Sequence, residues 1–230
     1  MKYEIIDSPD FALLELVLAQ GETVVAESGA MVAMDTNITV ETSMRGGLLG
    51  AAKRKLLGGE SLFQNTYRSQ SAGQRIYFAA AAEGDLKAKQ LAAGEEFFLQ
   101  SGSYVAHHGE GLVIDTKFGG MRGFFSGVGL FLLRIVGPGT VFYGSYGALH
   151  EVTLDNGLGY TVDTGHIVGF TSGLKYQIGT FGGMKGLFFS GEGLVANFSG
   201  QGSVFVQTRN AGNLASFLHP FRPVERRSGD

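Results

Sequence analysis

The chain has 230 residues, 44% of them hydrophobic and 17% charged, so it is long enough to fold around a sizeable core. Its formal net charge of −3 excludes a strong overall attraction to nucleic acid or to an anionic membrane surface. It has no cysteine, which excludes disulfides, thiolate catalysis and cysteine-ligated metals. Residues 1–10 lack the basic start and apolar core of a secretory signal, and we therefore expect a cytoplasmic protein.

A spacing of leucine and glycine recurs three times along the chain. Each set has a Leu-x-x-Gly, a second glycine eight residues later and a Gly-Gly pair seventeen residues after that. The sets start at Leu18, Leu91 and Leu154 and end at Gly46-Gly47, Gly119-Gly120 and Gly182-Gly183. Because this spacing is far longer than a helical or strand period, it predicts three copies of one supersecondary unit. We expect a single domain over 1–219 with repeats of about 1–82, 83–147 and 148–210, and a flexible tail over 220–230.

The predicted elements are mostly short strands joined by tight turns. In the first unit they cover Thr23–Glu27, Ala30–Met34 and Ile38–Thr42. Three residue pairs fall at matching places in the three units and are of types that accept positive φ in hairpin turns. They are Thr36-Asn37, Glu110-Gly111 and Ser172-Gly173. Helix is predicted only over Glu83–Leu91 and Ala211–Leu218. The expected fold class is therefore all-β, with three tandem β-sandwich-like repeats.

The most apolar run of the chain is Val128–Val136, which is bounded by glycines. A helix that spans a bilayer needs about twenty apolar residues, so this run is too short to cross one. Its composition and length fit a strand buried on both faces. The sequence therefore predicts no transmembrane segment.

The segments that follow the Gly-Gly pairs share a motif. The second copy reads Gly-Gly-Met-Arg-Gly-Phe-Phe-Ser-Gly from Gly119, and the third reads Gly-Gly-Met-Lys-Gly-Leu-Phe-Phe-Ser-Gly from Gly182. The first copy has a longer and more basic loop that ends in Gly-Gly-Glu-Ser-Leu-Phe from Gly58. Together these motifs resemble an uncharacterised family related to the yeast mitochondrial biogenesis protein named for altered inheritance of mitochondria. The resemblance covers the chain from about Tyr3 to Phe217.

The resemblance implies a fold like that of the tryptophan RNA-binding attenuation protein, with homotrimers that form a ring of nine units. The mitochondrial relative is associated with inner-membrane organisation, but this chain has no segment that resembles a transit peptide, so we do not carry that location over. An independent argument also favours assembly, because a unit this small leaves strand edges open and neighbouring units can cover them. The alternative is a closed monomer in which the three copies satisfy one another.

No catalytic or metal site is predicted from the motifs. Ser126 lies in Gly-Phe-Phe-Ser-Gly, which does not match the Gly-x-Ser-x-Gly of a nucleophile elbow, and Gly-Gly-Met-Lys-Gly lacks the ending of a phosphate-binding loop. His107 and His108 are adjacent and would point to opposite faces of a strand. His107 also aligns with Met34 and Phe170, which favours a core histidine over a metal ligand. We therefore expect no cofactor and no enzymatic activity.

Candidate binding residues gather in the three Gly-Gly hairpins. Glu60 and Glu192 fall at matching places, where they could do acid–base chemistry, although a solvent-facing turn residue is the simpler interpretation. Basic and apolar side chains that could contact a partner are Lys53, Arg54, Lys55, Arg122, Phe124, Phe125, Lys185, Phe188 and Phe189.

The first hypothesis for function is a non-enzymatic oligomeric binding or scaffold protein that acts through these hairpins. A packing role for the hairpin phenylalanines, in the core or a subunit interface, is the alternative to an exposed patch. A second hypothesis is an RNA-binding ring that uses the basic residues on phosphates, which the acidic balance of the chain disfavours. A third is a peripheral contact with anionic lipid through Lys53, Arg54 and Lys55.

Overall fold

The computed structural model describes residues 1–44, 63–118, 131–155, 157, 159–180 and 194–222. Within these ranges the regular structure is almost entirely β, which confirms the prediction of an all-β fold. The strands up to residue 79 are β1 (Lys2–Ile6), β2 (Leu13–Leu18), β3 (Thr23–Glu27), β4 (Met31–Met34), β5 (Ile38–Met44), β6 (Phe63–Ser69) and β7 (Gln74–Ala79).

The remaining elements continue the same pattern of short strands. The strands from residue 86 to 144 are β8 (Leu86–Leu91), β9 (Glu96–Gln100), β10 (Tyr104–His108), β11 (Val113–Phe118), β12 (Phe131–Val136) and β13 (Gly139–Gly144). The strands after them are β14 (Leu149–Leu154), β15 (Tyr160–Asp163), β16 (Ile167–Thr171), β17 (Leu174–Thr180), β18 (Leu194–Gly200) and β19 (Gly202–Gln207). The helical elements are the 3₁₀ turns η1 (Ser101–Ser103), η3 (Thr164–His166) and η4 (His219–Phe221), and the α-helix α3 (Ala211–Leu218).

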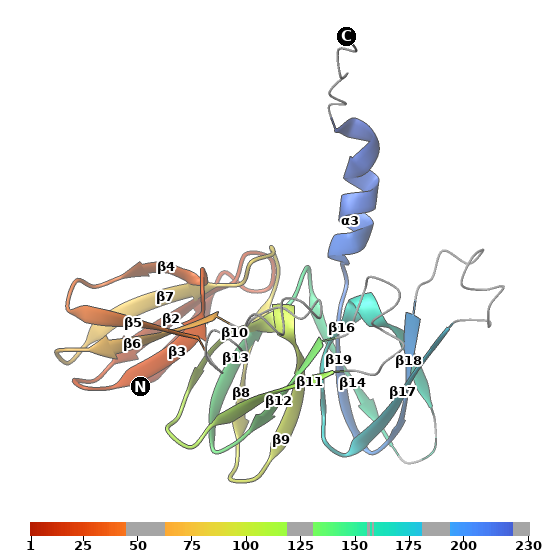
Figure 1. The fold of residues 1–230 in the computed structure, drawn as a ribbon, viewed down its shortest axis with the longest axis horizontal. Helices are drawn as coiled ribbons and strands as arrows, with labels where there is room; N and C mark the ends of the chain where they lie inside the picture. The colour runs from red at the N-terminus through yellow and green to blue at the C-terminus, as the bar shows by residue number, and fades with distance from the viewer. Residues whose placement is uncertain (45–62, 119–130, 156, 158, 181–193, 223–230) are drawn as a thin grey trace.

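These strands form four antiparallel sheets. In order of strands, the first sheet is β1-β2-β7-β4, the second is β5-β6-β3-β10-β13-β8, the third is β11-β12-β9-β16-β19-β14, and the fourth is β15-β18-β17. Figure 1 shows them following one another from the N-terminal strands on the left to β17 and β18 on the right, with α3 extending away from the strands. The two middle sheets have six strands each, whereas the terminal sheets have four and three.

Three buried clusters fill the spaces between successive sheets. The first cluster includes Leu14 of the first sheet and Val24 of the second. The second joins the second and third sheets and contains Phe97, Tyr143 and Phe205, whose ring centroids lie 5.4 to 6.0 Å apart. The third lies between the third and fourth sheets. The middle sheets are therefore covered on both faces, which explains why near-continuous apolar runs occur in their strands.

The pairing order of the strands recurs along the chain. The order β2-β7-β4 has counterparts in β8-β13-β10 and β14-β19-β16, and the order β5-β6-β3 has counterparts in β11-β12-β9 and β17-β18-β15. A shift of one residue interrupts the register of β4, β10 and β16 at the same place in each strand. The contacts of β10 with β3 and of β16 with β9 join these groups into the six-stranded sheets.

Two of the repeated glycines make equivalent turns. Gly21 and Gly94 have φ of +77° and +76°, in turns closed by the bonds Glu22 N–H to Ala19 O and Glu95 N–H to Ala92 O. The carboxylates of Glu22 and Glu95 each accept a further bond from the N–H at the start of the turn, at 2.8 and 3.0 Å. A type II turn needs positive φ at its third residue, and glycine supplies it without a steric cost.

The predicted helix over Glu83–Leu91 is wrong, because Leu86–Leu91 is strand β8. This strand pairs with β13 along its whole length, from Leu86 opposite Gly144 to Leu91 opposite Gly139. Asp85, buried just before the strand, accepts bonds from the Ser8 hydroxyl at 2.6 Å and from Leu86 N–H at 2.8 Å. The ladder of β8 with β13 outweighs a weak local preference for helix.

The structure confirms other predicted elements. Thr23–Glu27 is β3, Ala211–Leu218 is α3, and the apolar run contains β12, in which the adjacent Leu132 and Leu133 are both buried. Residues 128–130 of that run lie outside the described ranges. Of the predicted flexible tail over 220–230, residues 220 and 221 belong to η4, and residues 223–230 lie outside the described ranges.

The predicted turns occur at all three places, but their predicted positive φ is wrong. Bonds from Ile38 N–H to Asp35 O and from Leu112 N–H to Gly109 O close two of them, as in type I turns, which need no positive φ at their centre.

Candidate functional site

The binding residues predicted from the sequence all fall outside the described ranges, so their placement stays a prediction. Lys53, Arg54, Lys55 and Glu60 belong to residues 45–62, which connect β5 to β6. Arg122, Phe124 and Phe125 belong to residues 119–130, between β11 and β12. Lys185, Phe188, Phe189 and Glu192 belong to residues 181–193, between β17 and β18. Each segment thus connects two strands of an antiparallel pair.

Strand β4 has an open edge where its counterparts are covered. Among the described strands it pairs with β7 on one side only, whereas β10 pairs with both β13 and β3, and β16 pairs with both β19 and β9. The valine at the register shift is 1% exposed as Val105 in β10 and 0% exposed as Val168 in β16. Its counterpart in β4, Val32, is 57% exposed. An exposed strand edge with apolar side chains is a template for pairing with another strand.

Strand β15 has the complementary open edge at the other end of the molecule. Its counterparts β3 and β9 each pair on two sides, whereas β18 is the only strand in the described ranges that pairs with β15. Val162 is buried against the third cluster, and its neighbour Thr161 is exposed. Strands β4 and β15 are two of the edge strands of the four sheets, and their counterparts β10, β16, β3 and β9 are paired on both sides. These two strand edges are the candidate functional site, and we refer to them together as the terminal edges.

The contact of β10 with β3 and the contact of β16 with β9 are two internal junctions, which we call the first and the second. They differ in the chemistry of their side chains. At the first junction, Tyr104 of β10 accepts a bond from Gln64 Nε2 at 3.2 Å, and its hydroxyl lies 2.7 Å from His107 Nδ1 and 3.2 Å from Val25 O. Gln64, Tyr104 and His107, which we call the polar trio, are all buried. A buried polar group is costly unless it is hydrogen-bonded, so this network couples β6 and β3 to β10.

At the second junction, apolar side chains occupy the corresponding places. Leu132 stands where Gln64 is, Ile167 where Tyr104 is, and Phe170 where His107 is. Phe170 stacks on its register partner Phe98 with ring centroids 5.0 Å apart and planes at 17°. The same strand contact is therefore made once with a polar network and once with stacked rings.

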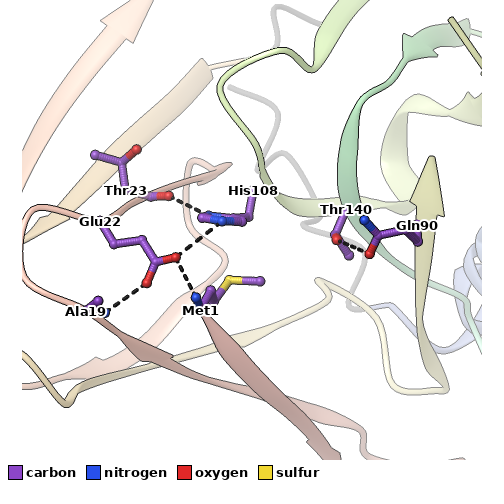
Figure 2. Close-up of polar contacts among 7 residues, drawn as sticks. All are labelled: Met1, Ala19, Glu22, Thr23, Gln90, His108 and Thr140. Carbon is purple, nitrogen blue, oxygen red and sulfur yellow. Dashed lines mark hydrogen bonds and ion pairs between the residues drawn. The ribbon is translucent and has the colours of Figure 1, made fainter. Parts of the chain in front are cut away.

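A second polar cluster ties the start of the chain to the first junction. Figure 2 shows the Glu22 carboxylate between the Met1 ammonium, which donates to Oε1 at 2.6 Å, and His108, whose Nε2 lies 3.3 Å from the same oxygen. The other ring nitrogen of His108 lies 2.9 Å from Thr23 O. Burial by itself raises the pKa of Glu22, but the bonds from Met1 and Ala19 and the nearby positive charges outweigh it, so the pKa is lowered.

The same close-up contains a bond between two neighbouring strands of the second sheet. The Thr140 hydroxyl on β13 donates to Gln90 Oε1 on β8 at 3.1 Å. Thr140 is buried, so the bond satisfies a polar group inside the sheet.

A recess of about 290 Å³ lies where η1 and η3 meet the first residues of α3. Among the side chains that line it are Gln100, Ser103, Thr164 and Asn210, and its lining from the described residues has no charged side chain. Asn210 Oδ1 is already used, because it accepts from Gly212 N–H and Asn213 N–H at the start of α3. The recess therefore suits water or a small uncharged molecule and does not indicate a particular ligand.

The histidine predictions agree with the structure. His107 is buried in the polar trio, and His108 points to the other side of β10 toward Glu22. Across the described ranges, no three or more His, Asp or Glu side chains gather in a way that could hold a metal ion. In the same ranges, no helix is both long and apolar enough to cross a membrane.

Sequence reasoning missed the terminal edges and the polar trio. The alignment of Met34 with His107 and Phe170 was a signal for equivalent strands, but it does not tell which of them lacks a neighbour. Gln64, Tyr104 and His107 lie 40 and 3 residues apart, so only strand pairing brings them together. The helical spacing of Leu214, Phe217, Leu218 and Phe221 was a signal for the exposed apolar face near the end of the chain.

The architecture is that of an all-β protein built from stacked sheets, in which the edge strands β4 and β15 of the two terminal sheets pair on one side only with other described strands. The chain belongs to the family described as mitochondrial biogenesis AIM24, whose model matches residues 3–209. It is 29% identical over 231 residues to an uncharacterised protein of Streptococcus pyogenes serotype M6, covering 97% of this chain and 92% of that protein. A crystal structure of a protein from Streptococcus pyogenes is similar at a TM-score of 0.80 and 28% identity, covering 96% of this chain and 99% of that one.

Proposed function

We propose that the chain is a threefold repeat of one six-strand unit, with a fold like that of the tryptophan RNA-binding attenuation protein. In this proposal, copies join head to tail through the terminal edges into a homotrimeric ring that serves as a non-enzymatic binding scaffold. The single observation that carries it is the pair of open edges on β4 and β15, whose counterparts in the same chain are paired with each other.

The strand orders support the match between the terminal edges. Setting β15 of one copy beside β4 of the next gives the order β17-β18-β15-β4-β7-β2. This order corresponds strand for strand to β5-β6-β3-β10-β13-β8, the second sheet of a single chain. Two incomplete terminal sheets would thus combine into one sheet of the kind that the chain already builds twice. A head-to-tail contact of this type repeats until it closes into a ring or extends as a filament.

The register of the contact follows from the internal junctions. His107 lies opposite Val25 in the first junction, and Phe170 lies opposite Phe98 in the second. The corresponding residues of the terminal edges are Met34 in β4 and Thr161 in β15. Met34 of one copy should therefore face Thr161 of the next.

A cysteine pair tests this register, because the natural chain has no cysteine. The Met34→Cys/Thr161→Cys variant should form disulfides between chains on mild oxidation, since facing strand residues lie at the Cβ separation that a disulfide needs. A closed trimer should give covalent species up to three chains and none larger. As a matched control, Met34→Cys/Lys175→Cys places the second cysteine on β17, at the other edge of the fourth sheet, and should remain reduced.

The mass in solution provides the second arm of the test. Light scattering of the unmodified chain should give three chain masses at micromolar concentration. A monomer, or a disulfide formed equally by the control pair, would refute the ring. A ladder of species beyond three chains would support the contact between the terminal edges but would refute its closure into a trimeric ring.

The partner-binding surface of the scaffold is proposed to lie in the three hairpin segments predicted from the sequence. One such segment connects the antiparallel pair of strands in each unit, so a trimer would present nine. The net charge of −3 disfavours RNA as that partner. Replacement of Lys53, Arg54 and Lys55 by alanine should weaken capture of an anionic partner while leaving the oligomeric mass unchanged.

A further inference from the structure

The helix α3 and the 3₁₀ turn η4 that follows it together carry an apolar face that no described part of the chain covers. Leu214, Phe217, Leu218 and Phe221 follow the spacing i, i+3, i+4 and i+7, which places them on one side of a helix. Phe217 is 67% exposed and Phe221 is 73% exposed, and their ring centroids lie 5.8 Å apart. No residue of α3 is buried, and the helix extends away from the strands (Figure 1).

The charges beside this apolar face are positive. Residues 209–224 contain Arg209 and Arg222 and no Asp or Glu. Both arginines are exposed, and neither makes an ion pair with a described residue. This local charge is opposite in sign to the net charge of the chain, which is −3. An apolar helical face flanked by arginines is complementary to a surface that is both apolar and anionic.

The size of the face argues against a second copy as its occupant. The four apolar side chains expose on the order of 400 Å², whereas a stable protein interface needs about 800 Å² from each partner. A lipid surface sets no such minimum, because each helix adds its own insertion energy and its own attraction to anionic headgroups.

We infer that α3 is an interfacial helix that docks the protein on an anionic lipid bilayer through Leu214, Phe217, Leu218 and Phe221, with Arg209 and Arg222 facing the headgroups. The site is complete in one chain, so this inference goes beyond the proposed ring and does not depend on it. In a cyclic assembly all copies of α3 would project from the same side of the ring and bind the same membrane together.

A single tryptophan reports insertion directly, because the natural chain contains none. The full-length Phe217→Trp variant should show an emission shift to shorter wavelength with vesicles of phosphatidylcholine and phosphatidylglycerol, and a much smaller shift with phosphatidylcholine alone. The matched reporter is Phe11→Trp, since Phe11 is 72% exposed but lies in the turn between β1 and β2. Its emission should not move. No shift for Phe217→Trp, or the same shift with neutral vesicles, would overturn the inference.

Charge substitutions then separate the apolar face from the rest of the helix. Phe217→Glu/Phe221→Glu should weaken flotation with anionic vesicles by more than about tenfold, because two inserted rings are lost. The charge-matched pair Ser216→Glu/His219→Glu lies on the opposite side of the helix, and both residues are exposed. This control should lose less. Equal loss in both pairs would overturn the assignment of the face.

The same variants reveal whether a second copy covers the face instead. All four substituted residues are exposed, so both pairs should keep the wild-type unfolding transition. A fall in oligomeric mass without vesicles, seen only for Phe217→Glu/Phe221→Glu, would show that the face is buried between copies, and would overturn docking on lipid. An unchanged mass with lost flotation supports the inference.

Discussion

Removal of one hydroxyl group from the polar trio should destabilise the first junction strongly. In Tyr104→Phe, the groups of Gln64, His107 and Val25 that lie 2.7 to 3.2 Å from that hydroxyl each lose a partner inside the protein. A lost hydrogen bond of this kind costs about 1 kcal/mol, and more when the group left behind is buried. We expect the free energy of unfolding to fall by about 2 to 4 kcal/mol.

The matched control is Tyr143→Phe, which removes a hydroxyl that makes no hydrogen bond to a described residue. Tyr143 is also buried, and burial, followed by the charges of Glu151 and Asp85, raises the pKa of its hydroxyl. This variant should lose less than about 0.5 kcal/mol. Urea unfolding followed by circular dichroism, at one protein concentration for all variants, measures both values. Equal losses for Tyr104→Phe and Tyr143→Phe would refute the role of the network.

A third variant tests whether the two junctions occupy equivalent places. Gln64→Leu/Tyr104→Ile/His107→Phe copies the apolar set of the second junction into the first. Gln64 and His107, which bond the Tyr104 hydroxyl, are replaced together with it, so of the three groups around that hydroxyl only Val25 O loses its bond. The triple variant should therefore be more stable than Tyr104→Phe alone. A triple variant that is less stable than the single one would show that the two sites differ in shape as well as in polarity.

Three further predictions concern single residues. The pKa of Glu22 is lowered in the folded protein, so its carboxylate stabilises the fold above the unfolded-state pKa and loses that effect as pH falls through the folded value. Glu22→Gln should hence be less stable than wild type at about pH 7, and the difference should shrink as the pH falls below the unfolded-state pKa, measured in urea titrations; a difference independent of pH would contradict this. Gly21→Ala and Gly94→Ala should each cost about 1 kcal/mol because of their positive φ, whereas Gly179→Ala should cost nothing measurable, since Gly179 has no such φ and its added Cβ would make an ordinary contact with Asn197 Nδ2 at 3.9 Å. Asn210→Ala should speed amide exchange in α3 alone, since it removes the bonds to Gly212 and Asn213, and unchanged exchange would contradict a capping role.

The sequence predicted an element correctly where a few neighbouring residues determine that element. The alternation in β3, the cap and apolar spacing of α3, and the glycine turn at Gly21 each depend on a few neighbouring residues. Glu83–Leu91 was mispredicted for the opposite reason. Its strand state depends on β13, whose partner residues are some fifty positions away, and nothing inside the segment reports that ladder.

The candidate site was less predictable, because an open strand edge is a property of the whole topology. Met34, His107 and Phe170 have equivalent positions, and only the strand order distinguishes the unpaired one. The sequence could suggest that edges are left open in a small repeated unit, but not that they belong to β4 and β15. The hairpin residues chosen from the motifs remain predictions, since they lie outside the described ranges.

Newly made chains with similar successive units are prone to join a strand to the wrong neighbour. If β16 took the place of β10 beside β3, Gln64 would meet Ile167 and Phe170, and its amide would lose the Tyr104 hydroxyl. If β10 lay beside β9, the Tyr104 hydroxyl and the His107 ring would meet Leu132 and Phe98 instead of Gln64 and Val25. Either exchange buries polar atoms against hydrocarbon and is penalised. The polar trio thus distinguishes the first junction from the second, which opposes the exchange of β10 and β16 between their matching places in the two sheets.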